Sequence, residues 1–144
     1  MLKGIHPAVG PDLLAALSRM GHGDSILLSD AHFPTGIFKN NIIIRADGIS
    51  IRTLLEGVLP LFELDQYSEY PVVMMQAVKG DKLDPEVEAG YYEIIFRITG
   101  NRPPLAHVER FDFYGLAKEC FAIVVTGETA KYGNILLKKG VVPC

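Results

Sequence analysis

Two kinds of apolar spacing alternate along the chain. Short continuous apolar runs occupy residues 26–28, 42–44, 72–75, 122–125 and 135–137. Runs of this length without polar alternation are typical of strands that are buried on both faces. Between them, apolar residues recur at helical spacing, which predicts helices over residues 11–20, 51–58, 85–99 and about 112–120. A further short strand is expected at residues 107–110.

Capping residues mark the ends of these helices. Pro11 suits a first helical turn, and Gly21 can end the first helix. Ser50 and Asp84 are suitable N-caps, and Gly100 can end the third helix. Because continuous apolar strands alternate with helices, the pattern predicts an α/β fold, a three-layer α/β/α sandwich with a largely parallel, mixed sheet.

Composition narrows the class of protein. The 144 residues are expected to form one domain over residues 1–144. Hydrophobic residues make up 49% of the chain, a share that indicates apolar surface buried between subunits. The formal net charge is -3 and the basic residues are scattered, which argues against a nucleic-acid partner.

The cysteines and the lengths of the apolar segments indicate the cellular compartment. No apolar segment reaches the length of a membrane span, and the N-terminal residues lack the apolar core of a signal peptide. Cys120 and Cys144 do not make a disulfide framework; Cys120 is expected to be a buried thiol and Cys144 a free one. We therefore expect a cytoplasmic protein with no membrane partner.

The first candidate for chemistry is a histidine between two glycines. His22 stands in the sequence Gly21-His22-Gly23-Asp24, just past the first predicted helix. Flanking glycines allow backbone conformations that present a side chain into a cleft, and imidazole titrates near neutral pH. The alternative is a loop histidine that is bonded to a backbone carbonyl. The two glycines favour a role in moving a proton.

Two polar segments follow apolar strands and should share one edge of the sheet. Asp30 follows the run at 26–28, and Gly127-Glu128 follows the run at 122–125. Ligands of such sheets usually bind at the carboxyl ends of the strands. Asp30 could instead cap the following segment, and His32 is a weaker candidate nearby.

Other candidates have plain structural interpretations as well. Arg110 on the predicted strand could form a structural ion pair with Glu109, and Asp112 could cap the next helix. The segment Tyr132-Gly133-Asn134 offers a phenol and an amide suited to a hydroxyl-rich ligand, although it is also an ordinary turn composition. Asp65 could be only a loop acid.

Several other chemistries fit the sequence poorly. The four histidines include no metal-binding pair with the spacing H-x-x-x-H, and a structural zinc site would need more Cys and His. No glycine-rich nucleotide loop is present. Ser25 and Ser29 lack the glycines of a nucleophile elbow, and Cys120 has no activating base nearby in the sequence.

Taken together, five segments resemble the family of L-fucose mutarotase and D-ribose pyranase. They span almost the whole chain in order: Met-Gly-His-Gly-Asp (20–24), Ser-Asp-Ala-His-Phe-Pro (29–34), Ile-Arg-Ala-Asp-Gly (44–48), Glu-Arg-Phe-Asp-Phe-Tyr (109–114) and Thr-Gly-Glu-Thr-Ala-Lys-Tyr-Gly-Asn-Ile-Leu-Leu-Lys-Lys-Gly-Val (126–141). Arg110 and the Gly-His-Gly-Asp segment resemble the fucose branch, because the ribose branch tends to carry histidine at that arginine and Gly-His-Thr-Asp. Gly115-Leu116 departs from the charged residues that relatives usually carry there.

The resemblance implies a sugar mutarotase that interconverts α and β anomers of a free aldose without metal or organic cofactor. It implies that His22 is the proton donor and that Asp30, Arg110 and Tyr132-Gly133-Asn134 contact the sugar, with Asp65 a further candidate. Asp30 could also orient His22 or accept the proton of the anomeric hydroxyl. The resemblance further implies a ring-shaped homo-oligomer, often a decamer, with sites near subunit boundaries.

One geometric question follows from the predicted strand. If residues 24–29 are extended, they span about 20 Å at roughly 3.3 Å per residue. His22 and Asp30 would then lie at opposite ends of one strand, unless residues 21–24 fold back or a neighbouring subunit completes the site. Two alternative functions stay open: a D-ribose pyranase activity, and a non-catalytic sugar-binding module on the same fold.

Overall fold

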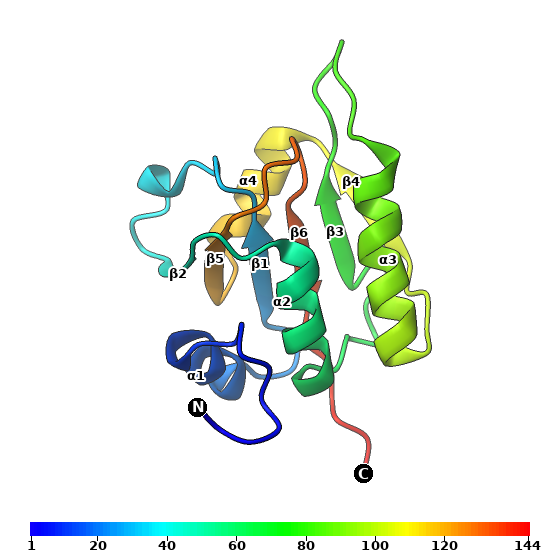
Figure 1. Ribbon diagram of the computed structural model, residues 1–144. Coiled ribbons are helices and arrows are strands. Elements are labelled where there is room, and N and C mark those ends of the chain that lie inside the picture. The colour runs from blue at the N-terminus through cyan, green and yellow to red at the C-terminus, as the bar shows by residue number, and fades with distance from the viewer.

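A computed structural model describes residues 1–144 and contains one six-stranded sheet in the order β2-β5-β1-β6-β3-β4 (Figure 1). Its strands are β1 (Ser25–Ser29), β2 (Ile42–Ala46), β3 (Val72–Met75), β4 (Leu105–Val108), β5 (Ala122–Thr126) and β6 (Ile135–Lys138). The helices are α1 (Pro11–Arg19), α2 (Ile51–Val58), α3 (Pro85–Thr99) and α4 (Arg110–Lys118), with short 3-10 turns η1 (Thr35–Ile37) and η2 (Leu59–Leu61).

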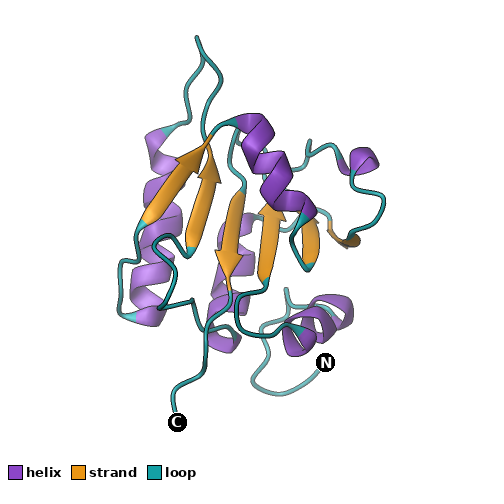
Figure 2. Ribbon diagram, turned by 180° about the vertical axis from the view of Figure 1, so that it is seen from behind, coloured by secondary structure: helices purple, strands orange, loops and turns teal.

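The sheet is mixed because of a single strand. β2, β5 and β1 are parallel neighbours, as are β3 and β4, whereas β6 runs antiparallel between β1 and β3 (Figure 2). Ile135, the first residue of β6, therefore pairs with Leu28 near the end of β1. This reversal places the segment before β6 at the carboxyl edge of β1 and β5, and it confirms the predicted fold class.

Helices cover both faces of the sheet. α2 and α3 pack on one face and α4 on the other, while α1 lies beside the amino end of β1 (Figures 1 and 2). The core on the α2–α3 side of the sheet, to which α1 also contributes, contains 25 buried residues, whereas the core on the α4 side contains 10. Most of the hydrophobic stabilisation therefore comes from the α2–α3 side.

The predicted boundary between β4 and α4 is wrong by two residues. β4 ends at Val108, and the Glu109 carboxylate accepts hydrogen bonds from the Phe111 and Asp112 N–H groups. Glu109 is therefore the N-cap of α4, a role that the sequence pattern had assigned to Asp112. A carboxylate at the N-cap also interacts favourably with the positive end of the helix dipole.

The two thiols are as expected. Cys120 is buried, and desolvation raises the pKa of its thiol to about 12. Cys144 is exposed, and neither cysteine is in a disulfide. Among the helices, none has the length and the apolar character to cross a lipid bilayer.

One glycine at the carboxyl edge cannot carry a side chain. A Cβ on Gly127 would lie 2.7 Å from the Gly48 Cα, with the Gly48 N and C atoms also within 3 Å. Gly127→Ala is therefore expected to lower the free energy of unfolding by about 1–3 kcal/mol, measured by chemical denaturation. Gly115→Ala is the control: it lies in α4 with open space around its Cα and should stabilise the protein by about 0.5–1 kcal/mol. Equal midpoints for the two variants would contradict this assignment.

Candidate functional site

The carboxyl edge of the sheet holds a buried carboxylate that is fixed by an amide. The Asp30 N–H donates to the Asn134 Oδ1 at 2.7 Å, and the Asn134 Nδ2 donates to the Asp30 Oδ2 at 3.1 Å. The His32 N–H donates to the other carboxylate oxygen at 2.9 Å. Burial raises the pKa of Asp30 above its usual value, although the bonds from His32 and Asn134 oppose that rise.

The turn before β6 presents Tyr132 in an unusual conformation. Tyr132 has φ of 60°, the left-handed region that non-glycine residues seldom adopt. The buried Tyr91 hydroxyl donates to the Gly133 carbonyl at 2.7 Å, and the Tyr132 hydroxyl donates to the Asp81 carboxylate at 2.9 Å. The turn is thus held from both sides, with Asn134 directly after it.

Arg110 lies at the same edge of the sheet, because it follows β4 as the first residue of α4. Its guanidinium lies over the Phe111 ring, 4.7 Å from the centroid. It forms no ion pair with Glu109, whose carboxylate caps the helix, so the expected structural pair is absent. The exposed guanidinium keeps its donors available to a ligand. We use the name sugar-contact cluster for Asp30, Arg110, Tyr132 and Asn134, the residues at this edge that the family resemblance predicts to contact the sugar. Arg110 follows β4, three strand positions from β1 in the sheet, and forms no hydrogen bond with the other three.

His22 lies at the opposite edge, where β1 begins. The neighbouring Gly23 N–H donates to the Lys139 carbonyl, directly after β6. The His22 Nε2 lies 3.0 Å from the Asp65 Oδ1. The His22 side chain is 47% exposed, whereas that of Asp65 is 3% exposed. We use the name imidazole pair for His22 and Asp65.

The charge of Asp65 determines which imidazole nitrogen carries a proton. Burial by itself would raise the pKa of Asp65, but hydrogen bonds from the Ser68 hydroxyl, the Tyr67 N–H and His22 outweigh it and lower the pKa to about 2. An ionised carboxylate can only accept, so the His22 Nε2 must donate to it. The Nδ1 atom is then the ring nitrogen that is left free for a ligand.

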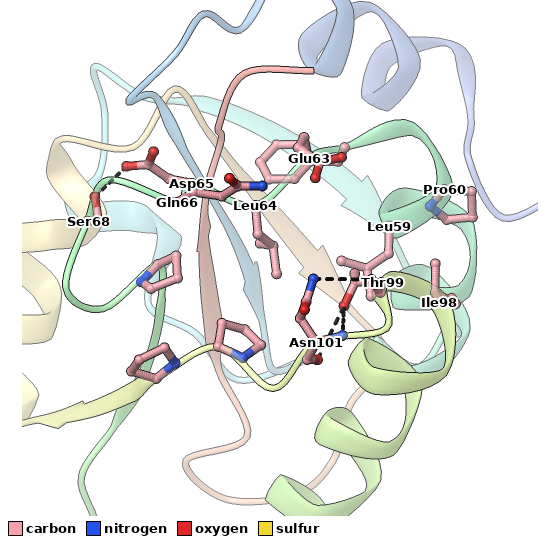
Figure 3. Close-up of a pocket in the computed structure, with 14 residues that line it drawn as sticks. Leu59, Pro60, Glu63, Leu64, Asp65, Gln66, Ser68, Ile98, Thr99 and Asn101 are labelled. Carbon is pink, nitrogen blue, oxygen red and sulfur yellow. Dashed lines mark hydrogen bonds between the residues drawn. The ribbon is translucent and has the colours of Figure 1, made fainter. Parts of the chain in front are cut away.

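An open groove of about 560 Å³ adjoins the imidazole pair (Figure 3). Asp65, Gln66 and Ser68 line one part of it, and Thr99 and Asn101 at the end of α3 line another. No residue of the sugar-contact cluster lines this groove. The groove therefore extends the site around Asp65 without connecting it to the other edge of the sheet.

Within one chain the predicted site residues lie at two opposite edges of the sheet. β1 alone spans about 16 Å at roughly 3.3 Å per residue, with His22 before it and Asp30 after it. The Gly23–Lys139 hydrogen bond holds residues 21–24 at the amino end of the strand, so this loop does not fold back. The expectation that Asp30 orients His22 is therefore wrong for residues of the same chain.

Three residues of these groups went unnoticed in the sequence. Ser68 and Tyr67 hold Asp65, and Asp81 holds Tyr132. The spacing Asp65-x-x-Ser68 is a weak local signal for a side-chain hydrogen bond. Asp81 is 51 positions from Tyr132, and no local pattern links the two.

Comparisons with known proteins agree along the full chain. Residues 3–142 match the family described as the RbsD / FucU transport protein family. The chain is 59% identical to an L-fucose mutarotase of Histophilus somni, covering 99% of both chains. It is 60% identical to an L-fucose mutarotase of Glaesserella parasuis serovar 5, covering 99% of this chain and 97% of that protein.

Solved structures share the fold. The crystal structure of the fucose mutarotase in complex with L-fucose from Streptococcus pneumoniae has a TM-score of 0.91 at 42% identity, covering 99% of this chain and all of that chain. Bacillus subtilis RbsD complexed with D-ribose has a TM-score of 0.77 at 18% identity, with coverage of 99% and 100%. The second similarity concerns the fold alone.

Proposed function

The chain belongs to the RbsD / FucU transport protein family, and we propose that it is a mutarotase that interconverts the α and β anomers of L-fucose. The observation that carries this proposal is the 59% identity, over essentially the whole length of both chains, to an L-fucose mutarotase. The residues at the two edges of the sheet supply the groups that such a reaction needs.

Anomerisation requires an acid and a base at two different oxygens. The anomeric hydroxyl loses a proton while the ring oxygen gains one, the ring opens, the C1–C2 bond rotates, and the ring closes on the other face. In its doubly protonated form, His22 donates the Nδ1 proton to the ring oxygen while Nε2 is engaged by Asp65, and Nδ1 recovers a proton from that oxygen when the ring closes. Asp65 fixes the orientation of the imidazole and stabilises its protonated form. The Tyr67 ring packs beside the His22 ring, with 5.4 Å between the two centroids.

The sugar-contact cluster holds the rest of the molecule. Arg110 donates only, the Asn134 amide can donate or accept, and the Tyr132 oxygen can accept, so together they can recognise several hydroxyls. Asp30 accepts from sugar hydroxyls or takes the proton of the anomeric hydroxyl, and burial, which raises its pKa, makes its carboxylate a stronger base. Gly133 leaves room for the Tyr91 hydroxyl behind the turn.

We propose that the imidazole pair of one protomer meets the sugar-contact cluster of another. The two groups lie at opposite edges of the sheet, and each is flanked by exposed apolar side chains. Tyr67 is 81% exposed beside His22, and Phe111 is 65% exposed beside Arg110. Burying both patches in one contact between copies would remove apolar surface from water and bring the groups together. This arrangement fits the ring-shaped homo-oligomer, often a decamer, that the family resemblance implies, and the free thiols favour the cytoplasm.

Saturation-transfer NMR of free sugars tests the proposed function. The wild-type protein is expected to increase the exchange between α and β L-fucose well above the spontaneous rate, and to act less on D-ribose. Exchange of D-ribose alone would instead support a pyranase. Line broadening of L-fucose without increased exchange would establish a binding module and contradict the proposal.

A further inference from the structure

A long arm projects beyond the carboxyl edge of the sheet. Residues 76–84 connect β3 to α3 and extend past the ends of both elements (Figure 1). Gly80, near the tip, has φ of 89°, the left-handed conformation that reverses the chain there. Asp81 follows directly, and its side chain points back to the turn before β6, where it meets Tyr132.

Asp81 provides the polar side-chain contacts of the arm with the rest of the chain. It accepts from the Tyr132 hydroxyl at 2.9 Å, and the Lys131 Nζ lies 3.6 Å from the same oxygen. No other side chain of residues 77–83 makes a hydrogen bond or an ion pair outside the arm. The arm is thus joined to the turn through one carboxylate.

The charge of Asp81 sets the hydrogen-bonding direction of Tyr132. The Lys82 N–H, the Tyr132 hydroxyl and Lys131 lower the pKa of Asp81, so it is ionised at neutral pH. Because a carboxylate only accepts, the Tyr132 O–H must donate to it, and the phenol oxygen keeps only its lone pairs for another partner. Toward a sugar, Tyr132 can then act only as an acceptor.

We infer that Asp81 is a positioning residue that orients Tyr132 as an acceptor for one hydroxyl of the sugar. This inference rests on the proposed function, since it assumes that Tyr132 contacts the substrate. The left-handed backbone at Tyr132 sets the direction in which the side chain leaves the chain, and the hydrogen bond to Asp81 sets the position of the phenol oxygen. Asp81 therefore acts on substrate binding through Tyr132 and does not take part in proton transfer.

A double-mutant cycle on L-fucose exchange tests the inference. Asp81→Ala is expected to raise KM roughly ten-fold, as for loss of one hydrogen bond to a charged group, with kcat nearly unchanged. In a Tyr132→Phe background the same change should have no further effect on KM, because the phenol hydroxyl is already gone. Lys82→Ala, which changes an exposed side chain at the next position of the arm, is the control and should match wild type.

Analogues of L-fucose test the direction of the hydrogen bond. Fluorine cannot donate, so for one monofluorinated analogue Asp81→Ala should leave KM unchanged, whereas the other analogues should keep the full ten-fold effect. An unchanged KM of Asp81→Ala for L-fucose, or an equal effect in the Tyr132→Phe background, would overturn the inference while wild-type exchange stayed intact. A wild-type protein without any exchange would instead reject the proposed function itself.

Discussion

Replacing His22 by alanine is expected to lower the catalysed rate of L-fucose anomer exchange by about a hundred- to ten-thousand-fold, the usual contribution of a positioned acid or base. Its Nδ1 is the proton carrier of the proposed mechanism, because Nε2 donates to the ionised Asp65. Spontaneous exchange continues in water, so the measured quantity is the increase above the protein-free rate. The His22→Ala variant is expected to fold, because the His22 side chain is 47% exposed.

His107 provides a closely matched control. It is a second histidine that pairs with an acidic residue, here Glu88, and its side chain is 45% exposed. His107→Ala removes an equivalent group from the edge strand β4 and should leave exchange at the wild-type rate. Asp65→Asn keeps the imidazole but removes the charge that orients it, and should lie between wild type and His22→Ala. Equal losses in His22→Ala and His107→Ala would refute the role of His22.

The fold could be predicted where the local pattern was unambiguous. Six strands and four helices were expected near their observed positions, because apolar runs, helical apolar spacing and capping residues are local signals. The start of α4 was misplaced because aspartate is a favoured N-cap and glutamate is not, so the local pattern favoured Asp112, whereas the backbone places Glu109 at the N-cap. The reversed direction of β6 depends on pairing with β1 and β3, which no local pattern encodes.

The candidate site could be predicted only in part, because local patterns do not show which distant residues meet. His22, Asp30 and residues 132–134 were singled out from local patterns, and their roles came from a family resemblance. The length of an extended β1 predicted that His22 and Asp30 lie apart. The partners within each group are long-range contacts: His22 meets Asp65 across 43 positions, and Asp30 meets Asn134 across 104. Asp65 was a further candidate for a sugar contact, and in the structure its carboxylate is hydrogen-bonded to the His22 Nε2.

Mixing two inactive variants is expected to restore activity if the site is shared between protomers. His22→Ala lacks the acid and Arg110→Ala lacks a sugar contact, and both side chains are exposed enough for the variants to fold. In an oligomer co-assembled from equal amounts, about one quarter of the shared sites combine an intact imidazole pair with an intact sugar-contact cluster. Exchange should therefore recover to about a quarter of the wild-type rate, measured by saturation-transfer NMR after co-expression with two different tags.

The control mixture combines two variants of the same group. Arg110→Ala and Tyr132→Phe both alter the sugar-contact cluster, so every shared site in their mixed oligomer carries one of the two changes. That mixture should show no recovery beyond the average of its components, although it assembles as readily. If His22→Ala and Arg110→Ala co-assemble without any recovery, the site is not shared between protomers. Both groups would then have to act within one chain, although they lie at opposite edges of the sheet. The shared site would then have to be abandoned, while the effect of His22→Ala on its own would still decide the role of the imidazole.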